Sequence, residues 1–472
     1  MTLAIDNSWL DADRKTSSAQ SKMMKTKVIL TVAVIVLGAV GTVALYGVGS
    51  NATQYRSEGI VIDFGDYLTI WVDAGTGNVK DPINLLTLAE SQHMSAGFSY
   101  TVTDNNLVSV TYNSTTYAND STHSWNLWTV SDGSFDAERN PDTSLDVSDY
   151  TVAIWAYTDA DGKPMTAVDA TGTSVYGYAE PNSIVSLSPV CTETLNSVRG
   201  TQKIVGTDMY SDYPEEIVNG HNDGSIAIVG SYTDPSYEAI MNTSPEMVFC
   251  DASTYNQVQM SRMLRSSNVN AVVLYNGEDI ETIYKNIFIC GIAIGYNMAP
   301  QAYLQKLDYY IQVLHDLSAP AEGKKVMVAL GSDPSPWVAG DYTYISDILK
   351  ELHCTNAFES VGGWANITRE SILEKNPDCI IVIDSDKYKV EDYDLMMSNL
   401  AMEWKSTDAY PDSVFLLTEK MGSIAGRAGP RFIQLMEIIC ELIVPESFTE
   451  PVPDKAVGDN YHDYLYLTGA ME

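Results

Sequence analysis

Two stretches of the sequence share one pattern, VGSYTDPSYEAIMNTSPEMV at Val229–Val248 and VGGWANITRESILEKNPDCI at Val361–Ile380. Each begins with Val-Gly and an aromatic residue, continues with a glutamate, an isoleucine and a proline at the same spacing, and leads into an apolar run. A repeat that occurs only twice, at a wide spacing, is typical of paired domains rather than of a solenoid. The sequence therefore predicts two similar lobes, each with a loop, a short acidic helix and a strand.

The region around the repeats has the sequence pattern of an α/β fold. Apolar runs such as SIVSLS, MVFCD, AVVLY, KVMVAL, CIIVID and SVFLLT alternate with amphipathic stretches of helix length, which favours parallel sheets. Pro300–Leu317 places Leu304, Leu307, Ile311 and Leu314 on one helical face between the repeats. We expect two Rossmann-like lobes joined by a long helix. The predicted boundaries are 183–298 for the N-lobe, 299–323 for the interlobe helix, 324–446 for the C-lobe and 447–472 for a C-terminal tail.

Residues 58–180 differ from the lobes. They are rich in Thr, Ser, Tyr and Val, and short alternating runs such as GIVIDF, YLTIWV, LVSVTYN and TVAIWAY are separated by turn signals. This pattern predicts a small antiparallel β domain with one helix near Pro82–Met94.

A membrane-spanning helix is predicted at Val28–Val48, which reads VILTVAVIVLGAVGTVALYGV and carries no charge. A spanning helix needs about 20 apolar residues. Basic residues cluster just before this helix, so residues 1–27 are expected to be a cytoplasmic tail and the later domains to be extracellular. A cleaved signal peptide is the alternative, although the apolar stretch is long for one and no clear cleavage site follows.

The composition excludes several classes of function. Asp and Glu number 62 against 27 Lys and Arg, for a net charge of −35, which argues against a nucleic-acid partner. No phosphate-binding loop, nucleophile elbow or dinucleotide motif occurs, so we expect neither an enzyme nor an intrinsic cofactor. The histidines and cysteines lack metal-ligand spacing. The six cysteines are expected to be small buried hydrophobes, and a single disulfide between two of them is the alternative.

The repeated aromatic residues and glutamates can be placed in the two predicted lobes. Ligands of open α/β sheets bind beyond the carboxyl ends of the strands, so Tyr232 and Trp364 would line a cleft from opposite lobes. Glu238 and Glu370 would lie on the first turn of one helix in each lobe. The alternatives are ordinary packing for the aromatic residues and helix-start charges for the glutamates.

Several motifs resemble one family. IVSLSPVCTETL at Ile184–Leu195, GTDMYSDYPEE at Gly206–Glu216, the two repeat loops and GRAGPRF at Gly426–Phe432 occur in the order seen in solute-binding proteins of ABC importers for cobalamin, haem and ferric siderophores. The cobalamin branch is the most similar. The resemblance covers Ser183–Glu446, and it departs from the family at Cys191, where serine is usual.

The resemblance implies roles for individual residues. It places four aromatic residues and three polar ones at the ligand cleft: Tyr210, Tyr232, Trp337, Trp364, Asp251, Ser423 and Arg427. It also aligns Glu238 and Glu370 with the glutamates that dock onto arginines of the permease dimer. Large aromatic faces suit a planar macrocycle, and exposed carboxylates suit guanidinium groups.

The β domain is similar, over short motifs, to the C-terminal domain of transcobalamin-type carriers. The shared motifs are WNLW at Trp125–Trp128, WAY at Trp155–Tyr157 and VYGY at Val175–Tyr178. A role as a spacer that lifts the lobes off the membrane is the alternative. The expected function is capture of a cobalamin-like corrinoid for an ABC permease. The alternatives are a haem or ferric-siderophore binder, a surface enzyme or chelatase acting on a metallated macrocycle, and a sensor or adhesion module.

Overall fold

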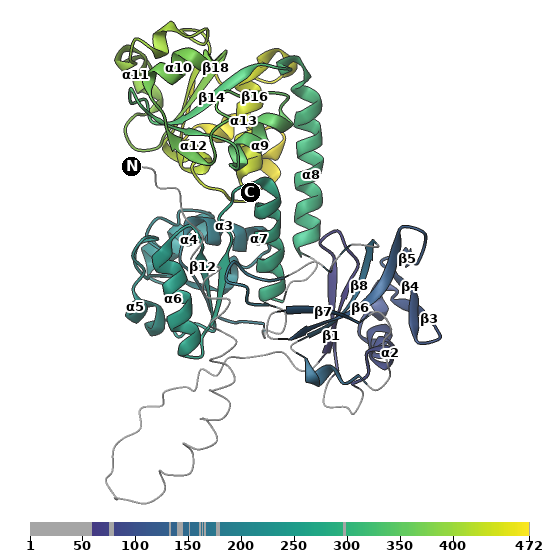
Figure 1. Ribbon diagram of the computed structural model, residues 1–472. Helices are drawn as coiled ribbons and strands as arrows, with labels where there is room; N and C mark the ends of the chain where they lie inside the picture. The colour runs from purple at the N-terminus through teal and green to yellow at the C-terminus, as the bar shows by residue number, and fades with distance from the viewer. Residues whose placement is uncertain are drawn as a thin grey trace, which may run out of the picture.

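The computed structural model describes residues 59–471 apart from 75–79, 132–133, 139–144, 151, 160–161, 163, 165–166, 176–179 and 296–298. Within that range the chain forms a β-rich domain and two α/β lobes, and one long helix, α8, runs along the side of both lobes (Figure 1). The predicted α/β class with two lobes and a connecting helix is confirmed.

The N-lobe has a parallel sheet with the strand order β11-β10-β9-β12-β13. Its strands are β9 (Ile184–Ser186), β10 (Ile204–Thr207), β11 (Ala227–Ile228), β12 (Met247–Asp251) and β13 (Asn270–Leu274). Its helices are α3 (Pro189–Ser197), α4 (Glu215–Asp223), α5 (Tyr237–Asn242), α6 (Tyr255–Ser266) and α7 (Ile280–Ala293). Strands β9, β12 and β13 are buried along their whole length, as in sheets covered by helices on both faces.

The C-lobe sheet has the order β17-β15-β14-β18-β19-β20, with β16 also paired to β14. Its strands are β14 (Lys325–Leu330), β15 (Trp337–Ala339), β16 (Thr355–Asn356), β17 (Trp364–Asn366), β18 (Cys379–Asp384), β19 (Val414–Thr418) and β20 (Ala456–Val457). Its helices are α9 (Tyr344–Glu351), α10 (Arg369–Lys375), α11 (Tyr393–Asn399), α12 (Glu419–Ala425) and α13 (Phe432–Ile443). The pairs β14–β15 and β15–β17 are antiparallel, and the others are parallel.

Helix α8 spans Ala299–Leu317 and buries Leu304, Leu307 and Leu314, which confirms the predicted helix and its apolar face. The helix is shorter than the predicted 299–323. It gives way to a 3-10 turn at Ala319–Ala321, and Gly323 has a φ of +77°, a conformation that ends a helix.

The segment after 446 is part of the C-lobe. Strand β20 adds to the sheet edge beside β19, and the amides of Leu467 and Thr468 donate to the buried Glu437 carboxylate on α13 at 2.7 and 2.9 Å. All six cysteines are buried free thiols, so the reading as small buried hydrophobes is confirmed and the open alternative of a disulfide is not realised.

The β-rich domain has a sheet of order β2-β1-β8-β6-β7 and a smaller sheet β3-β4-β5. Its elements are β1 (Gly59–Asp63), β2 (Thr69–Asp73), α2 (Pro82–Gln92), β3 (Ser99–Thr103), β4 (Asn106–Tyr112), β5 (Thr115–Ala118), β6 (His123–Ser131), β7 (Ser134–Glu138) and β8 (Val152–Asp159). The expectation of a purely antiparallel domain is wrong, because β1 and β8 are parallel. The long excursion through α2 and the smaller sheet returns β8 beside β1 in the same direction.

This domain packs directly on the N-lobe. Helix α2 packs on one face of the domain's larger sheet. Residues of the other face, such as Trp128 and Ile154, share a buried cluster with residues of α7. Tyr67 meets the rings of Tyr284 and Phe288 on α7 edge to face, with centroids 6.1 and 5.7 Å apart. From Ile283 on, helix α7 is buried nearly all round, which explains the apolar run Ile287–Ala293 in its second half.

The connection between the domains is also fixed. Asp169 is fully buried, pairs with Arg265 at 2.5 Å and accepts a hydrogen bond from the Val273 amide of β13. The predicted membrane span at Val28–Val48 and the cytoplasmic tail lie outside the described residues. Within the described residues, none of the helices has the length and apolarity needed to cross a membrane.

Candidate functional site

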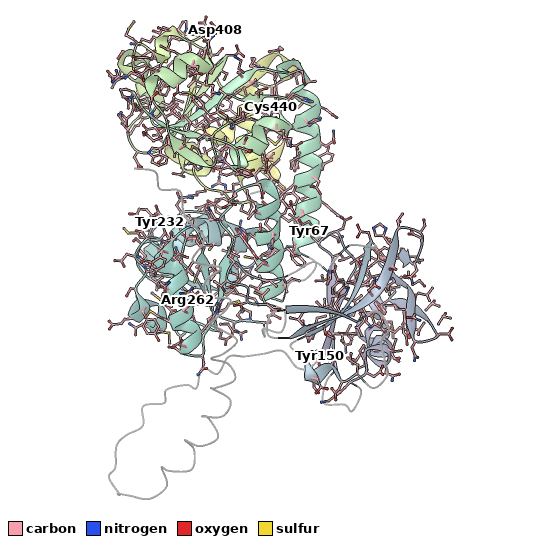
Figure 2. The ribbon with its side chains drawn as sticks, viewed as in Figure 1. Tyr67, Tyr150, Tyr232, Arg262, Asp408 and Cys440 are labelled. Carbon is pink, nitrogen blue, oxygen red and sulfur yellow. The ribbon has the colours of Figure 1, made fainter. Side chains whose placement is uncertain are left out.

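The loop that carries Tyr232 follows β11 at the carboxyl edge of the N-lobe sheet. Gly230 opens the loop with a φ of +123°, and a Cβ there would lie 2.7 Å from Asp234 O, so the position requires glycine. The buried Gln257 amide donates to Tyr232 O at 2.7 Å and holds the loop against α6. The Tyr232 side chain is 42% exposed and lies on the part of the N-lobe turned toward the C-lobe (Figure 2).

Tyr210 lies on the neighbouring loop, which follows β10. The Tyr210 amide donates to Asp208 Oδ1 at 2.8 Å, and Ser211 Oγ donates to Asp208 Oδ2 at 2.5 Å. Burial raises the pKa of the Asp208 carboxyl, against the opposing effect of these hydrogen bonds. The Tyr210 ring is 51% exposed and meets the Tyr232 ring edge to face, with centroids 5.9 Å apart. The structure therefore brings two of the predicted ligand aromatics together.

The two predicted tryptophans form a second group on the C-lobe. Strands β15 and β17 pair in a register that sets Trp337 opposite Asn366 and Ala339 opposite Trp364. Residues opposite each other share a face, and so do residues two apart, so the two indoles project from the same side of the sheet. Both are partly exposed, and Leu330, which is opposite Trp337 on β14, adds to this apolar face.

Asp251 and Ser423 occupy more enclosed positions. Asp251 ends β12, is buried, and accepts hydrogen bonds from Ser188 Oγ at 3.1 Å and from the Ser253 amide at 2.8 Å. Burial raises the pKa of its carboxyl, and the hydrogen bonds oppose that rise. Because Ser188 caps α3, Asp251 fixes the start of that helix. Ser423 is half-buried within α12. Asp251 is linked to the Tyr232 loop through Gln257, whose Oε1 accepts from the Asp251 amide at 2.8 Å and whose side-chain amide donates to Tyr232 O at 2.7 Å.

Arg427 lies between α12 and α13 and contacts the N-lobe. Its Nη1 is 2.8 Å from Glu193 Oε1 and 2.7 Å from Asp212 Oδ1, and its Nη2 donates to Tyr210 O at 3.2 Å. Burial opposes the charge of the guanidinium, but the two carboxylates outweigh it and raise the Arg427 pKa. The arginine is thus committed to protein acceptors.

Glu238 and Glu370 occupy matching positions, as the repeat predicts. Glu238 is the second residue of α5, whose cap Ser236 accepts from the Ala239 amide. Glu370 is the second residue of α10, whose cap Thr368 accepts from the Ser371 amide. Both glutamates are exposed. The cap of each helix satisfies one amide of its first turn, and both carboxylates lie on the surface.

These elements agree with a known family. A family model described as periplasmic binding protein matches residues 184–413. Those residues belong to the periplasmic binding protein family. The matched range includes both aromatic groups and both glutamates, and it leaves the β-rich domain outside.

Individual relatives of the periplasmic binding protein domain have low sequence identity. An ABC transporter substrate-binding lipoprotein of Bacillus subtilis (strain 168) is 25% identical over 293 residues, which cover 61% of this chain and 88% of the relative. The vitamin B12-binding protein of Pectobacterium carotovorum subsp. carotovorum (strain PC1) is 22% identical over 271 residues, which cover 56% and 88%. Among solved structures, a possible iron-binding periplasmic solute-binding protein of Staphylococcus epidermidis ATCC 12228 has 20% identity and a TM-score of 0.49, covering 56% of this chain and 99% of that one.

The periplasmic binding protein domain is a binding module and not an enzyme, because the matching family and both relatives are binding proteins. Within the described residues no group of three or more His, Cys, Asp or Glu side chains could hold a metal ion. The parts played by Glu193, Asp212 and Asp208 were not predicted from the sequence. Glu193 stands among small and apolar residues in CTETL, and a carboxylate that is buried on such a helix needs a partner.

Proposed function

We propose that this chain captures a corrinoid outside the cell and delivers it to an ABC permease. The observation that carries the proposal is the pair of partly exposed aromatic groups, Tyr210 with Tyr232 on one lobe and Trp337 with Trp364 on the other. Aromatic faces supply large contact areas at low cost in conformational entropy, which suits a broad macrocycle held between two lobes. The family match and the relative that binds vitamin B12 support this class of ligand.

The electrostatics favour a corrinoid over haem. Haem carries two carboxylates, which need cationic partners, whereas the rim of a corrin ring carries uncharged amides. Arg427, which donates to the carbonyl of Tyr210, is already neutralised by Glu193 and Asp212. The net charge of −35 also disfavours an anionic ligand.

The proposed partner is a permease dimer that receives Glu238 and Glu370. Their matching positions on α5 and α10 support a contact with two related permease subunits, because symmetric partners favour paired contacts. Arginine is the expected counterpart, since its fork of donors matches a carboxylate. In this proposal Val28–Val48 anchors the chain in the cell membrane with the N-terminus in the cytoplasm.

A titration of the full chain in detergent tests the ligand. We expect cyanocobalamin and dicyanocobinamide to quench tryptophan fluorescence, to raise the melting temperature through mass action and to bind with one site per chain. Haemin and ferrichrome are titrated under the same conditions. Binding to haemin or ferrichrome with no response to either corrinoid would replace the corrinoid proposal by the alternative ligand class.

A further inference from the structure

The contact of Arg427 with the N-lobe is the most buried charged contact between the lobes that we describe. The Arg427 side chain is 15% exposed and that of Glu193 is 1% exposed, so the pair is shielded from water. Arg427 also reaches Asp212 and the carbonyl of Tyr210, and both belong to the N-lobe loop 208–214. One C-lobe side chain therefore holds α3 and this loop together.

A second arginine of the same segment holds the other end of the loop. The Arg431 guanidinium lies over the Tyr213 ring at 4.1 Å from its centroid, and its Nη2 donates to Tyr461 Oη at 2.8 Å. Arg431 is buried, and the cavity that it lines with Tyr213 and Glu193 has a volume of only about 10 Å³. This junction is too closely packed to admit a macrocycle, so the arginines act on the loop and not on a ligand in the cavity.

We propose that Arg427 is a positioning residue that sets the Tyr210–Tyr232 aromatic pair from the opposite lobe. The carbonyl of Tyr210 accepts from Arg427, while the amide of the same residue donates to Asp208. The peptide groups on both sides of the Tyr210 Cα are thereby fixed, and the ring is held edge to face against Tyr232. The spacing of the lobes and the orientation of the aromatic pair are then coupled through one guanidinium. The coupling to ligand affinity rests on the proposed function, but the coupling to loop order does not.

The arrangement of the acceptors around residue 427 explains why an arginine is needed there. A lysine carries one compact ammonium group and cannot span two carboxylates and a carbonyl from fixed positions, whereas the planar guanidinium does so with two of its nitrogens. Loss of the arginine would also leave Glu193 as a buried carboxylate without its partner. The structural and positioning effects must therefore be separated by design.

Three variants of the full chain separate them. Arg427→Lys keeps the positive charge but loses the fork. Arg427→Met combined with Glu193→Gln removes both charges of the buried pair, which is expected to restore the melting temperature close to that of the parent chain. Lys203→Met, which breaks an ion pair between the N-lobe and Glu180 and leaves the Arg427 contact intact, is the matched control.

The decisive measurement is hydrogen exchange of the loop 208–214 in the ligand-free protein. Because hydrogen bonds to charged groups are the stronger ones, we expect exchange in this loop to rise roughly tenfold or more in Arg427→Lys and in the double variant, and to stay unchanged in Lys203→Met. With cyanocobalamin as the probe, the dissociation rate should rise in the same two variants. Unchanged exchange in both would overturn the proposal. Faster exchange in a protein that binds no corrinoid would uphold it and instead defeat the proposed ligand.

Discussion

Replacing Tyr232 by Ala tests whether its ring contacts a ligand or only packs against other residues of the protein. In the structure the side chain is 42% exposed and has one ring partner, Tyr210, at 5.9 Å. Loss of one aromatic pair costs about 0.5–1.5 kcal/mol of unfolding free energy, and the exposed half of the ring contributes little more. A ring that stacks on a ligand contributes about 1–3 kcal/mol to binding. We therefore expect corrinoid affinity to fall roughly 5- to 150-fold at that magnitude, while stability falls only slightly.

The assay pairs cyanocobalamin titration with urea unfolding of the same preparations. Tyr309→Ala is the matched control, because Tyr309 is 64% exposed on α8 and also meets a tyrosine, Tyr310, edge to face at 5.2 Å. It should cost similar stability and leave the affinity unchanged. The reasoning is refuted if Tyr232→Ala lowers stability by several kcal/mol and binds as tightly as the parent chain, because the ring would then be a packing residue.

Three further perturbations address other parts of the molecule. Replacing Glu238 and Glu370 together by Ala should leave corrinoid affinity in solution unchanged and abolish uptake by cells, and each single replacement should lower uptake less. Normal uptake by the double variant would show that the two glutamates act only as charges at their helix starts. Tyr67→Ala should lower the unfolding free energy by about 1–3 kcal/mol, measured in urea, because two ring contacts between the β-rich domain and α7 are lost. Burial raises the pKa of Glu441 to about 9, so its proton is bound in the folded state but lost in the unfolded state from about pH 4.5 upward. Stability should therefore fall as the pH rises from about 5 to 9, and Glu441→Gln should flatten that slope by up to about 1.4 kcal/mol per pH unit; a slope that is unchanged in this variant would contradict the assignment.

The lobes were predictable because their signals are local and duplicated. Each half of the repeat carries a cap, a glutamate in the first turn of a short helix and a buried strand, and the structure has these elements as α5 with β12 and α10 with β18. The apolar face of Pro300–Leu317 likewise fixed the interlobe helix. Patterns of this kind depend on the helical and strand periods alone, so a single sequence is enough to reveal them.

The contacts between distant segments were not predictable in the same way. Arg427 was expected near a ligand, and the structure instead engages it with Glu193, which lies far away in the sequence. The parallel pairing of β1 with β8 and the packing of the β-rich domain on α7 also depend on which surfaces meet. One clue existed, since the second half of α7, Ile287–Ala293, has no polar face that could lie in water.

Taken together, the contacts determine how the two glutamates would meet a partner. Helix α8 connects the lobes along one side (Figure 1), and the Arg427 contact joins them at a second point. The N-lobe is further braced by the β-rich domain through α7. Two separate connections restrict rotation of one lobe against the other far more than a single hinge does. In the proposed docking, the spacing between Glu238 and Glu370 would be set before the permease is met, so docking would lose little conformational freedom and favour a partner of fixed twofold spacing.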